Sequence, residues 1–269
     1  MQFNFNLINN NAMIKKLPLF LSIVCLSLTG FSQEKTEKIY WYTSSDTKGF
    51  ISFQKVNGDA NSKVPVILNT NVNAQFDEEV LNFNLSTACE SEKMVDANKF
   101  VFKGTIDSNI EPVQFTGTKV KTVKNNISFW HFDGDFADEV ETDPDFQSFA
   151  FAKYNATLKI PARTIPSFNL WAIIPKLPFD RKGTFKFNAL DETKLYVRKN
   201  QTVNYLGTTK TNINGEQLTL HKFVHQGKGM SPTYFWVSKE RELMQVLLDD
   251  KYTFTISTKE AALETAVVE

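Results

Sequence analysis

Alternation of apolar and polar residues, one position in two, runs through most of this chain from residue 39 onward. The apolar positions are mainly β-branched or aromatic, which is the pattern of strands with one buried face. Short strands in close succession pair antiparallel, because parallel strands need long crossover connections. The pattern predicts strands at residues 39–43, 49–55, 65–71, 80–87, 99–106, 113–123, 127–132, 149–160, 183–189, 193–199, 201–212, 216–226, 233–238, 243–248 and 252–257.

Turn residues separate the later strands. Asn214-Gly215 lies between two long alternating runs and is the strongest hairpin signal, because this pair accepts the positive φ angles of a tight turn. Residues 239–241 and 249–251 predict two more turns, so the last hundred residues read as a meander.

Residues 164–174 depart from the strand pattern. Ile165, Phe168, Trp171 and Ile174 have helical spacing, Pro166 stands near the start and Pro175 follows the end. We predict a short helix that lies on a sheet, with a hydrophobic loop as the alternative. The Ala- and Glu-rich tail 259–269 is either a frayed helix or disordered.

The N-terminal segment has the features of a secretory signal peptide. Lys15 and Lys16 precede an apolar run at 17–28, and small residues at Gly30 and Ser32 favour cleavage after Ser32. Twelve residues make a helix of roughly 18 Å, shorter than a hydrocarbon core of about 30 Å, which disfavours a permanent membrane span. We predict a signal peptide at 1–32 and an exported chain, periplasmic or secreted, from a Gram-negative bacterium.

Two alternatives accompany this leader. Residues 1–12 are uncharged and rich in Asn, which points to Met13 as the true start. Cys25 permits a lipoprotein, although Val24 rather than a small residue precedes it; a buried core helix is the other option. The rest of the chain, 37–257, is predicted to be one β-rich domain with a subdivision, if any, near 133–148, followed by the tail.

Charge and cysteine content reduce the number of function classes that the chain could belong to. The chain has 30 basic and 30 acidic residues, and loss of the leader removes two lysines and no acid. This balance disfavours nucleic acid as the principal partner, because phosphate binding needs a concentrated basic face. Cys89 is then the one remaining cysteine and cannot form an internal disulfide. With no His within forty residues, we expect a small buried hydrophobic residue rather than a nucleophile.

The loop at 133–145 gathers seven carboxylates and is the candidate metal site. Asp133, Asp135 and Asp138 are the proposed ligands of a hard cation such as Ca²⁺, which prefers several oxygens on a flexible loop. The spacing does not match the helix-loop-helix calcium motif. The alternative is that mutual repulsion simply keeps the loop solvated. No other cofactor is indicated.

The three histidines give no clear catalytic pattern. His221 and His225 lie four residues apart in a predicted strand, roughly 13 Å along it, too far to share one ion without a bulge. His131 stands close to Asp133, but no placed Ser or Cys completes a triad. Glycine-rich phosphate loops, paired-cysteine metal knuckles and nucleophile-elbow motifs do not occur in the sequence. Residue types therefore do not indicate a reaction.

Phenylalanine is the one compositional anomaly. The chain has 24 Phe, of which 20 follow the leader. Aromatic side chains at alternate strand positions either fill the interior of a packed sheet or line a concave surface open to an apolar ligand. Packed core is the default for strands, and a sugar-stacking platform of exposed Trp is a third option.

The order of features after residue 160 resembles a known group. It includes Ile-Pro-Ser-Phe-Asn-Leu-Trp-Ala-Ile-Ile at 165–174, Leu-Pro-Phe-Asp-Arg-Lys-Gly at 177–183, Asn-Gly-Glu at 214–216 and Tyr-Phe-Trp-Val-Ser at 234–238. This C-terminal half resembles exported bacterial proteins of unknown function whose sheet is similar to the half-barrel of periplasmic lipoprotein carriers. The resemblance implies a mainly β fold in which a curved antiparallel sheet, a half-barrel or open barrel, packs around the helix and leaves an apolar cavity. It carries over no catalytic residue.

These observations favour a non-enzymatic binding protein of the cell envelope. A hydrophobic, lipid-like ligand or a protein segment would lie in the concavity, with Phe168, Trp171 and Trp236 as walls, and association with a membrane would be peripheral. The alternative is an extracytoplasmic, cation-dependent enzyme or glycan-binding protein that uses loop 133–145 with His131 beside it. A structural envelope component without a pocket is the third hypothesis.

Overall fold

The computed structural model describes residues 38–57, 66–105, 113–123, 127–135, 156–161, 164–179, 183–192 and 196–267. These residues all belong to one compact unit, Lys38–Glu269. The predicted signal peptide at 1–32, Met13 and Cys25 lie outside the described residues. In the described part of the chain, no helix is both long enough and apolar enough to cross a bilayer.

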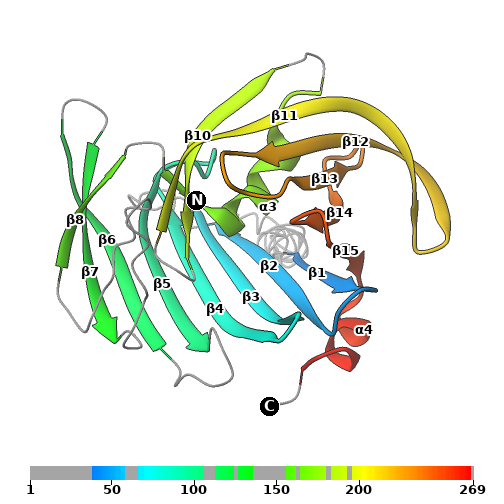
Figure 1. Ribbon diagram of the computed structural model, residues 1–269, viewed down its shortest axis with the longest axis horizontal. Helices are drawn as coiled ribbons and strands as arrows, with labels where there is room; N and C mark the ends of the chain where they lie inside the picture. Colours follow the sequence, from blue (N-terminus) through cyan, green and yellow to red (C-terminus); the bar gives the residue numbers. More distant parts are fainter. Residues whose placement is uncertain are drawn as a thin grey trace, which may run out of the picture. The chain divides into compact units, whose positions relative to one another are not determined.

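The fold is mainly β, as predicted, and its strands form one sheet (Figure 1). The strands are β1 (Ile39–Ser44), β2 (Gly49–Asn57), β3 (Val66–Phe76), β4 (Glu79–Cys89), β5 (Ala97–Thr105), β6 (Val113–Val123), β7 (Ile127–Asp135), β8 (Ala156–Pro161), β9 (Thr164–Pro166), β10 (Thr184–Asp191), β11 (Tyr196–Ile213), β12 (Glu216–Gln226), β13 (Thr233–Val237), β14 (Leu243–Leu248) and β15 (Tyr252–Ser257).

The first and last strands of this sheet are neighbours. β1 pairs antiparallel with β15, with Trp41 opposite Ser257. From this pair, β2 to β8 continue in sequence order to one side, and β14 back to β9 continue to the other. Each strand pairs antiparallel with its neighbour, except that β9 runs parallel to β10. Among the described strands, β8 and β9 are the two edges of the sheet although they follow one another in the chain.

The two edges lie close together, so the sheet is nearly closed. Three peptide units separate Pro161 at the end of β8 from Thr164 at the start of β9, a span of at most about 11 Å. The Thr164 hydroxyl donates a hydrogen bond to the Pro161 carbonyl oxygen at 2.6 Å. We call this junction the seam. The curved sheet around a short helix, expected from the sequence, is the observed architecture (Figure 1).

A helical segment of three short turns follows the seam. It consists of η1 (Ser167–Asn169), α3 (Leu170–Ile173) and η2 (Ile174–Lys176). The predicted helix begins three residues too early, because Thr164–Pro166 pairs with β10 as strand β9 and Pro166 is extended at ψ 135°. Pro175 does not end the segment, since it occupies the first turn of η2, where a missing N–H group removes no helical hydrogen bond.

The inner core surrounds this helical segment. The Trp171 ring contacts Tyr42 edge-on at a centroid distance of 5.1 Å, and Phe254 lies 6.3 Å away. Phenylalanines on neighbouring strands continue the core, with Phe102 stacked on Phe83 at 4.7 Å and on Phe115 at 4.9 Å. Much of the phenylalanine surplus therefore fills the inside of the curved sheet.

A second, smaller cluster lies on the outward face. Its buried members are Ile213, Leu220 and Trp236. The β11–β12 hairpin, with the predicted Asn214-Gly215 turn at its tip, is longer than the strands beside it, and residues before His221 extend past β13. The Asn214 side-chain amide donates to the Ile256 carbonyl oxygen at 3.0 Å, so the tip folds over the outer face of β13–β15.

The remaining differences from the sequence pattern are local. The sequence pattern predicts two strands separated at Asn200, whereas the structure has the single strand β11. Asn200 takes a positive φ of 57° without ending the strand. The tail forms α4 (Lys259–Glu264), and the Thr258 hydroxyl accepts a hydrogen bond from the Ala261 N–H. Beyond α4, the Asn73 side chain accepts a hydrogen bond from the Val267 N–H at 2.7 Å.

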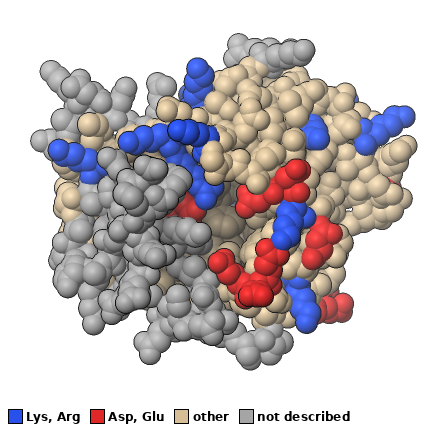
Figure 2. Space-filling view, in the orientation of Figure 1, with Lys and Arg blue, Asp and Glu red and all other residues tan. Residues whose placement is uncertain are grey.

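Surface charges are interspersed. Figure 2 shows acidic and basic side chains next to one another on the face in view. Ion pairs join Lys38 to Glu242 at 2.5 Å and Lys251 to Asp77, and all of these side chains except the half-buried Glu242 are more than half exposed. Exposed pairs of this kind contribute little to stability, because water and salt screen them.

Candidate functional site

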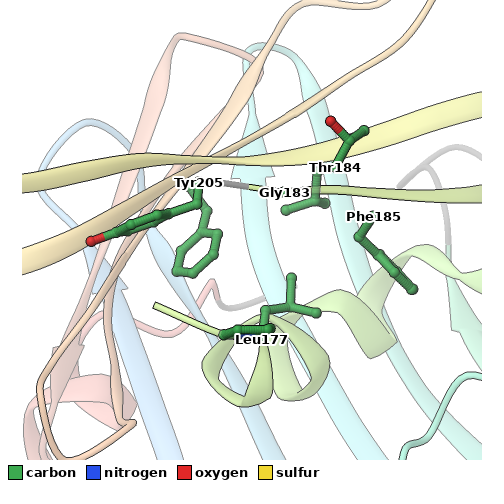
Figure 3. A pocket seen from close by; sticks show the side chains of 8 residues that line it. Leu177, Gly183, Thr184, Phe185 and Tyr205 are labelled. Atoms are coloured by element: carbon green, nitrogen blue, oxygen red, sulfur yellow. The ribbon is translucent and has the colours of Figure 1, made fainter. Parts of the chain in front are cut away.

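A cavity of about 430 Å³ lies beside the end of the helical segment, inside strands β10–β12. Its walls come from the segment after η2, from the start of β10 and from the inner faces of β11 and β12 (Figure 3). The lining residues are Leu177, Pro178, Gly183, Thr184, Phe185, Val203, Tyr205 and Phe223. We call it the inner pocket. Its volume lies within the range of small-molecule sites.

Strand alternation explains how these residues meet. Val203 and Tyr205 are two positions apart on β11 and therefore share a face. Phe185 pairs with Val203 across β10–β11, and Phe223 pairs with Tyr205 across β11–β12. Leu177, from the end of the helical segment, faces the strands that carry Tyr205 and Phe185 (Figure 3). Three strands and one connecting segment thus build an apolar wall.

The segment that closes this pocket is fixed by Arg241. The Arg241 guanidinium donates to the carbonyl oxygens of Pro175 and Leu177 at 3.1 and 2.9 Å. It also lies over the Phe179 ring, 4.3 Å from the centroid, which is a cation–π distance. The Phe179 ring stacks on His221 at 3.9 Å with an interplanar angle of 15°. Residues 177–179 are therefore attached to the strands by both hydrogen bonds and ring contacts.

Tyr205, which lines the pocket, also makes a polar contact between β11 and β12. The Tyr205 hydroxyl and His221 Nδ1 are 2.9 Å apart and share a hydrogen bond. Burial, followed by the positive charge of Arg241, lowers the pKa of His221, which favours the neutral imidazole. One positive charge and one hydrogen-bonded pair thus lie next to the lining residues Leu177 and Tyr205.

Glu192 is buried beneath the start of the helical segment. Its side chain is 1% exposed, and its Oε1 accepts a hydrogen bond from the Phe168 N–H at 3.0 Å. Burial raises the pKa of Glu192 to about 8, which outweighs the opposing effect of the Phe168 hydrogen bond. Glu192 does not line the inner pocket, so we assign it the role of capping the helical segment.

Two further polar side chains lie on the pocket's face of the sheet. His225 pairs with Val203, and burial, followed by the charge of Arg198, lowers the pKa of His225 to about 4. The Gln201 side chain lies over Gly227, where an added Cβ would come within 2.2 Å of it. Within the described residues, His225 Nε2 and Gln201 Oε1 are buried without a hydrogen-bond partner.

The three residues predicted from the sequence to line the binding cavity lie in two different parts of the structure. Phe168 and Trp171 both belong to the helical segment and the inner core, where Phe168 meets Phe83 edge-on at 5.6 Å. Trp236 faces outward in the second cluster. The inner pocket is lined instead by Phe185, Tyr205 and Phe223, which sequence reasoning missed. The alternation of Gln201, Val203 and Tyr205 along one strand is the signal that could have identified part of this wall.

The acidic loop falls largely outside the described residues. Asp133 is exposed near the end of β7, whereas Asp138 and the side chain of Asp135 are not described. His131 Nδ1 lies 3.4 Å from the Thr157 hydroxyl. Among the residues described, no three His, Cys, Asp or Glu side chains come together as a metal site. The Ca²⁺ site at Asp133, Asp135 and Asp138 therefore stays a prediction.

Cys89 is buried at the end of β4, as expected. Burial raises the pKa of its thiol to about 12, although the Asn169 side chain, 3.7 Å from Sγ, acts in the opposite direction. A thiol with this pKa carries almost no thiolate at neutral pH, and the thiolate is the nucleophilic form. The side chain thus serves as core and as a contact for the helical segment.

Comparison with protein families, with curated proteins and with solved structures finds no match to this chain. The fold and the inner pocket therefore define its class by themselves. It is a mainly β protein with one nearly closed sheet, a short helical segment inside the sheet and an apolar pocket next to that segment.

Proposed function

We propose that this is an exported, non-enzymatic binding protein of the cell envelope that holds a hydrophobic, lipid-like ligand in the inner pocket. The observation that carries the proposal is the pocket itself. Among the described residues of the sheet interior, aromatic and aliphatic side chains pack into one core, whereas about 430 Å³ next to Leu177 stays open. The predicted signal peptide and the resemblance to lipoprotein carriers support the same function and place.

The lining favours an apolar ligand. Leu177, Phe185, Val203 and Phe223 present hydrocarbon surface, and transfer of an apolar chain from water to such a surface is favourable in proportion to the area buried. Polar groups lie next to the lining, where the Tyr205 hydroxyl contacts His221 and Arg241 donates to the Leu177 carbonyl oxygen. A molecule with an apolar body and one polar end fits this arrangement, with its polar end toward Arg241. A protein segment with the same chemistry is the other occupant.

Gly183 offers a direct test of the pocket. It lines the cavity, and a Cβ added there meets no atom within 4 Å, so a larger side chain can enter the cavity without backbone strain. We expect the purified protein to bind the uncharged fluorophore N-phenyl-1-naphthylamine, and palmitate to displace it. Gly183→Phe should weaken binding of the fluorophore at least tenfold.

The matched control is Leu206→Ala. Leu206 is an exposed hydrophobic residue at the β11 bulge, outside the pocket, and could adsorb an apolar probe nonspecifically. This variant should bind the fluorophore as the parent does. Equal binding by the parent and Gly183→Phe, or loss of binding only in Leu206→Ala, would contradict the proposed site.

A further inference from the structure

A second hollow lies on the opposite, outward face of the sheet. It has a volume of about 320 Å³ and extends across strands β1–β5. Strands in a sheet lie about 4.8 Å apart, so five strands span about 19 Å, the length of a short oligomer rather than of a single small molecule. We call it the outer groove. It is separated from the inner pocket by the sheet and the inner core.

Asparagine side chains form the floor of the outer groove. Asn69 and Asn71 on β3 and Asn84 on β4 line it, and Asn73 and Asn82 continue the same outward rows. Asn is disfavoured in strands, where Thr, Val and other β-branched residues are preferred. Five Asn at outward positions of two adjacent strands therefore lower the β-propensity of these strands more than solubility alone would require.

Cross-strand hydrogen bonds hold these amides in fixed orientations. The Asn71 Nδ2 donates to Asn84 Oδ1 at 2.9 Å, and the Ser86 hydroxyl donates to Asn69 Oδ1 at 2.9 Å. Each Asn side chain has two donor hydrogens and one acceptor oxygen. With respect to the described residues, these bonds leave Asn71 Oδ1 as an acceptor and the amide nitrogens of Asn84 and Asn69 as donors for a ligand. A preoriented amide loses little conformational entropy on binding.

The chemistry of the groove selects among ligand classes. Among the described residues of its lining, Lys103 is the one that carries a charge, which does not favour a polyanion, and the other polar groups are neutral. Trp41 lies in the groove, is half-buried and rests against Phe50 at 5.2 Å, so its indole is held in place. A neutral ligand that both donates and accepts hydrogen bonds and has flat apolar patches matches these groups.

We propose that the outer groove binds a neutral oligosaccharide. Sugar hydroxyls both donate and accept, as the amide rows require, and the C–H face of a sugar ring packs against an aromatic ring. This site is independent of the apolar ligand in the inner pocket and of the acidic loop.

The test uses a panel of neutral oligosaccharides built from glucose, mannose, galactose and N-acetylglucosamine, with oligogalacturonate as the anionic member. Binding is measured by isothermal titration calorimetry on the full chain and on the double variant Asn71→Thr, Asn84→Thr. Thr suits a strand better than Asn, so the variant should unfold in urea at the same or a higher concentration. We expect at least one neutral oligosaccharide to bind, and the double variant to bind it at least tenfold more weakly.

Controls separate this proposal from the one for the inner pocket. Gln226→Ala removes an exposed amide from the end of β12, which three strands separate from β1, and should bind the oligosaccharide as the parent does. The double variant should still bind N-phenyl-1-naphthylamine with unchanged affinity. No binding of any neutral member at millimolar concentration, tighter binding of oligogalacturonate, or unchanged binding in the double variant would overturn the oligosaccharide site.

Discussion

Individual side chains attach the helical segment to the sheet at several points. Glu192 accepts the Phe168 N–H at its start, Asn169 contacts Cys89 Sγ, and the Lys176 ammonium donates to the Glu92 carbonyl oxygen at 3.1 Å near its end. Of these, the Glu192 carboxyl is the one whose protonation changes near neutral pH. It therefore couples the anchoring of the segment to pH.

The pH dependence follows from the raised pKa of Glu192. In the unfolded chain this carboxyl ionises near its ordinary value of 4.5, whereas in the folded chain it holds its proton to about 8. Between these values the folded state binds more protons, so this group lowers the free energy of unfolding as pH rises, by at most about 1.4 kcal/mol per pH unit. Below pH 4.5 its contribution is fully present.

Glu192→Gln should remove this dependence while keeping an oxygen for the Phe168 N–H. We expect the variant to gain stability relative to the parent as pH rises from 5 to 8, with the difference levelling off above pH 8. Urea unfolding of both proteins at several pH values measures it. A difference that stays constant across this range would show that Glu192 is ionised in the folded protein.

For the strands, alternation predicts which residues form each strand better than it predicts which side chains face the core. The predicted bounds of β6, β12, β14 and β15 match the structure. In β15, for example, apolar and polar residues alternate from end to end. In β13, by contrast, Tyr234, Phe235 and Trp236 are consecutive aromatics, and period two cannot say which of them faces inward. The folded-over β11–β12 hairpin makes the outward face apolar as well, and this is why Trp236 lies away from Trp171.

Gly117 in β6 shows how tightly the inner core is packed. A Cβ at this position would lie 2.6 Å from the ring of Phe100 and 2.9 Å from that of Phe132. Both rings are buried among other aromatics and cannot move freely. Gly117→Ala should therefore lower the free energy of unfolding by about 1–3 kcal/mol, the usual cost of overpacking a core.

Gly183→Ala is the matched control for this substitution. No atom lies within 4 Å of a Cβ at Gly183, so its stability should stay within about 0.5 kcal/mol of the parent. Urea unfolding of both variants provides the comparison. Equal effects at the two glycines would mean that the packing around Phe100 can relax.

For the whole molecule, the order of strands places the most distant parts of the sequence together. Trp41 and Ser257 are paired in the interior of the sheet, while the two edges, β8 and β9, come from the middle of the chain. Local patterns in the sequence do not encode this order, because alternation defines the faces of a strand but not its partner. The inner pocket was equally hard to predict in detail, since it needs β10, β11, β12 and Leu177 to be placed together.

In most folded chains the terminal segments open first, so their amides exchange with solvent fastest. Because the terminal strands lie in the interior of this sheet, we expect the opposite order here. We expect the amides of β1 and β15, such as those of Tyr42 and Phe254, to exchange with deuterium slowly, and those of β8 and β9 to exchange fastest among the strands. Hydrogen exchange followed by mass spectrometry measures both sets. Faster exchange in β1 and β15 than in β8 would contradict the arrangement of the sheet.

The pairing of β1 with β15 has a consequence for how the polypeptide could be connected. Because the sheet already joins its first and last strands, a short peptide linking them would add a connection between neighbours. The described strands do not pair across the seam, and two residues, 162 and 163, connect them, so the seam is the place where the backbone could be opened. A circular permutant that begins at β9 and ends at β8 would keep every pair of neighbouring strands in the sheet.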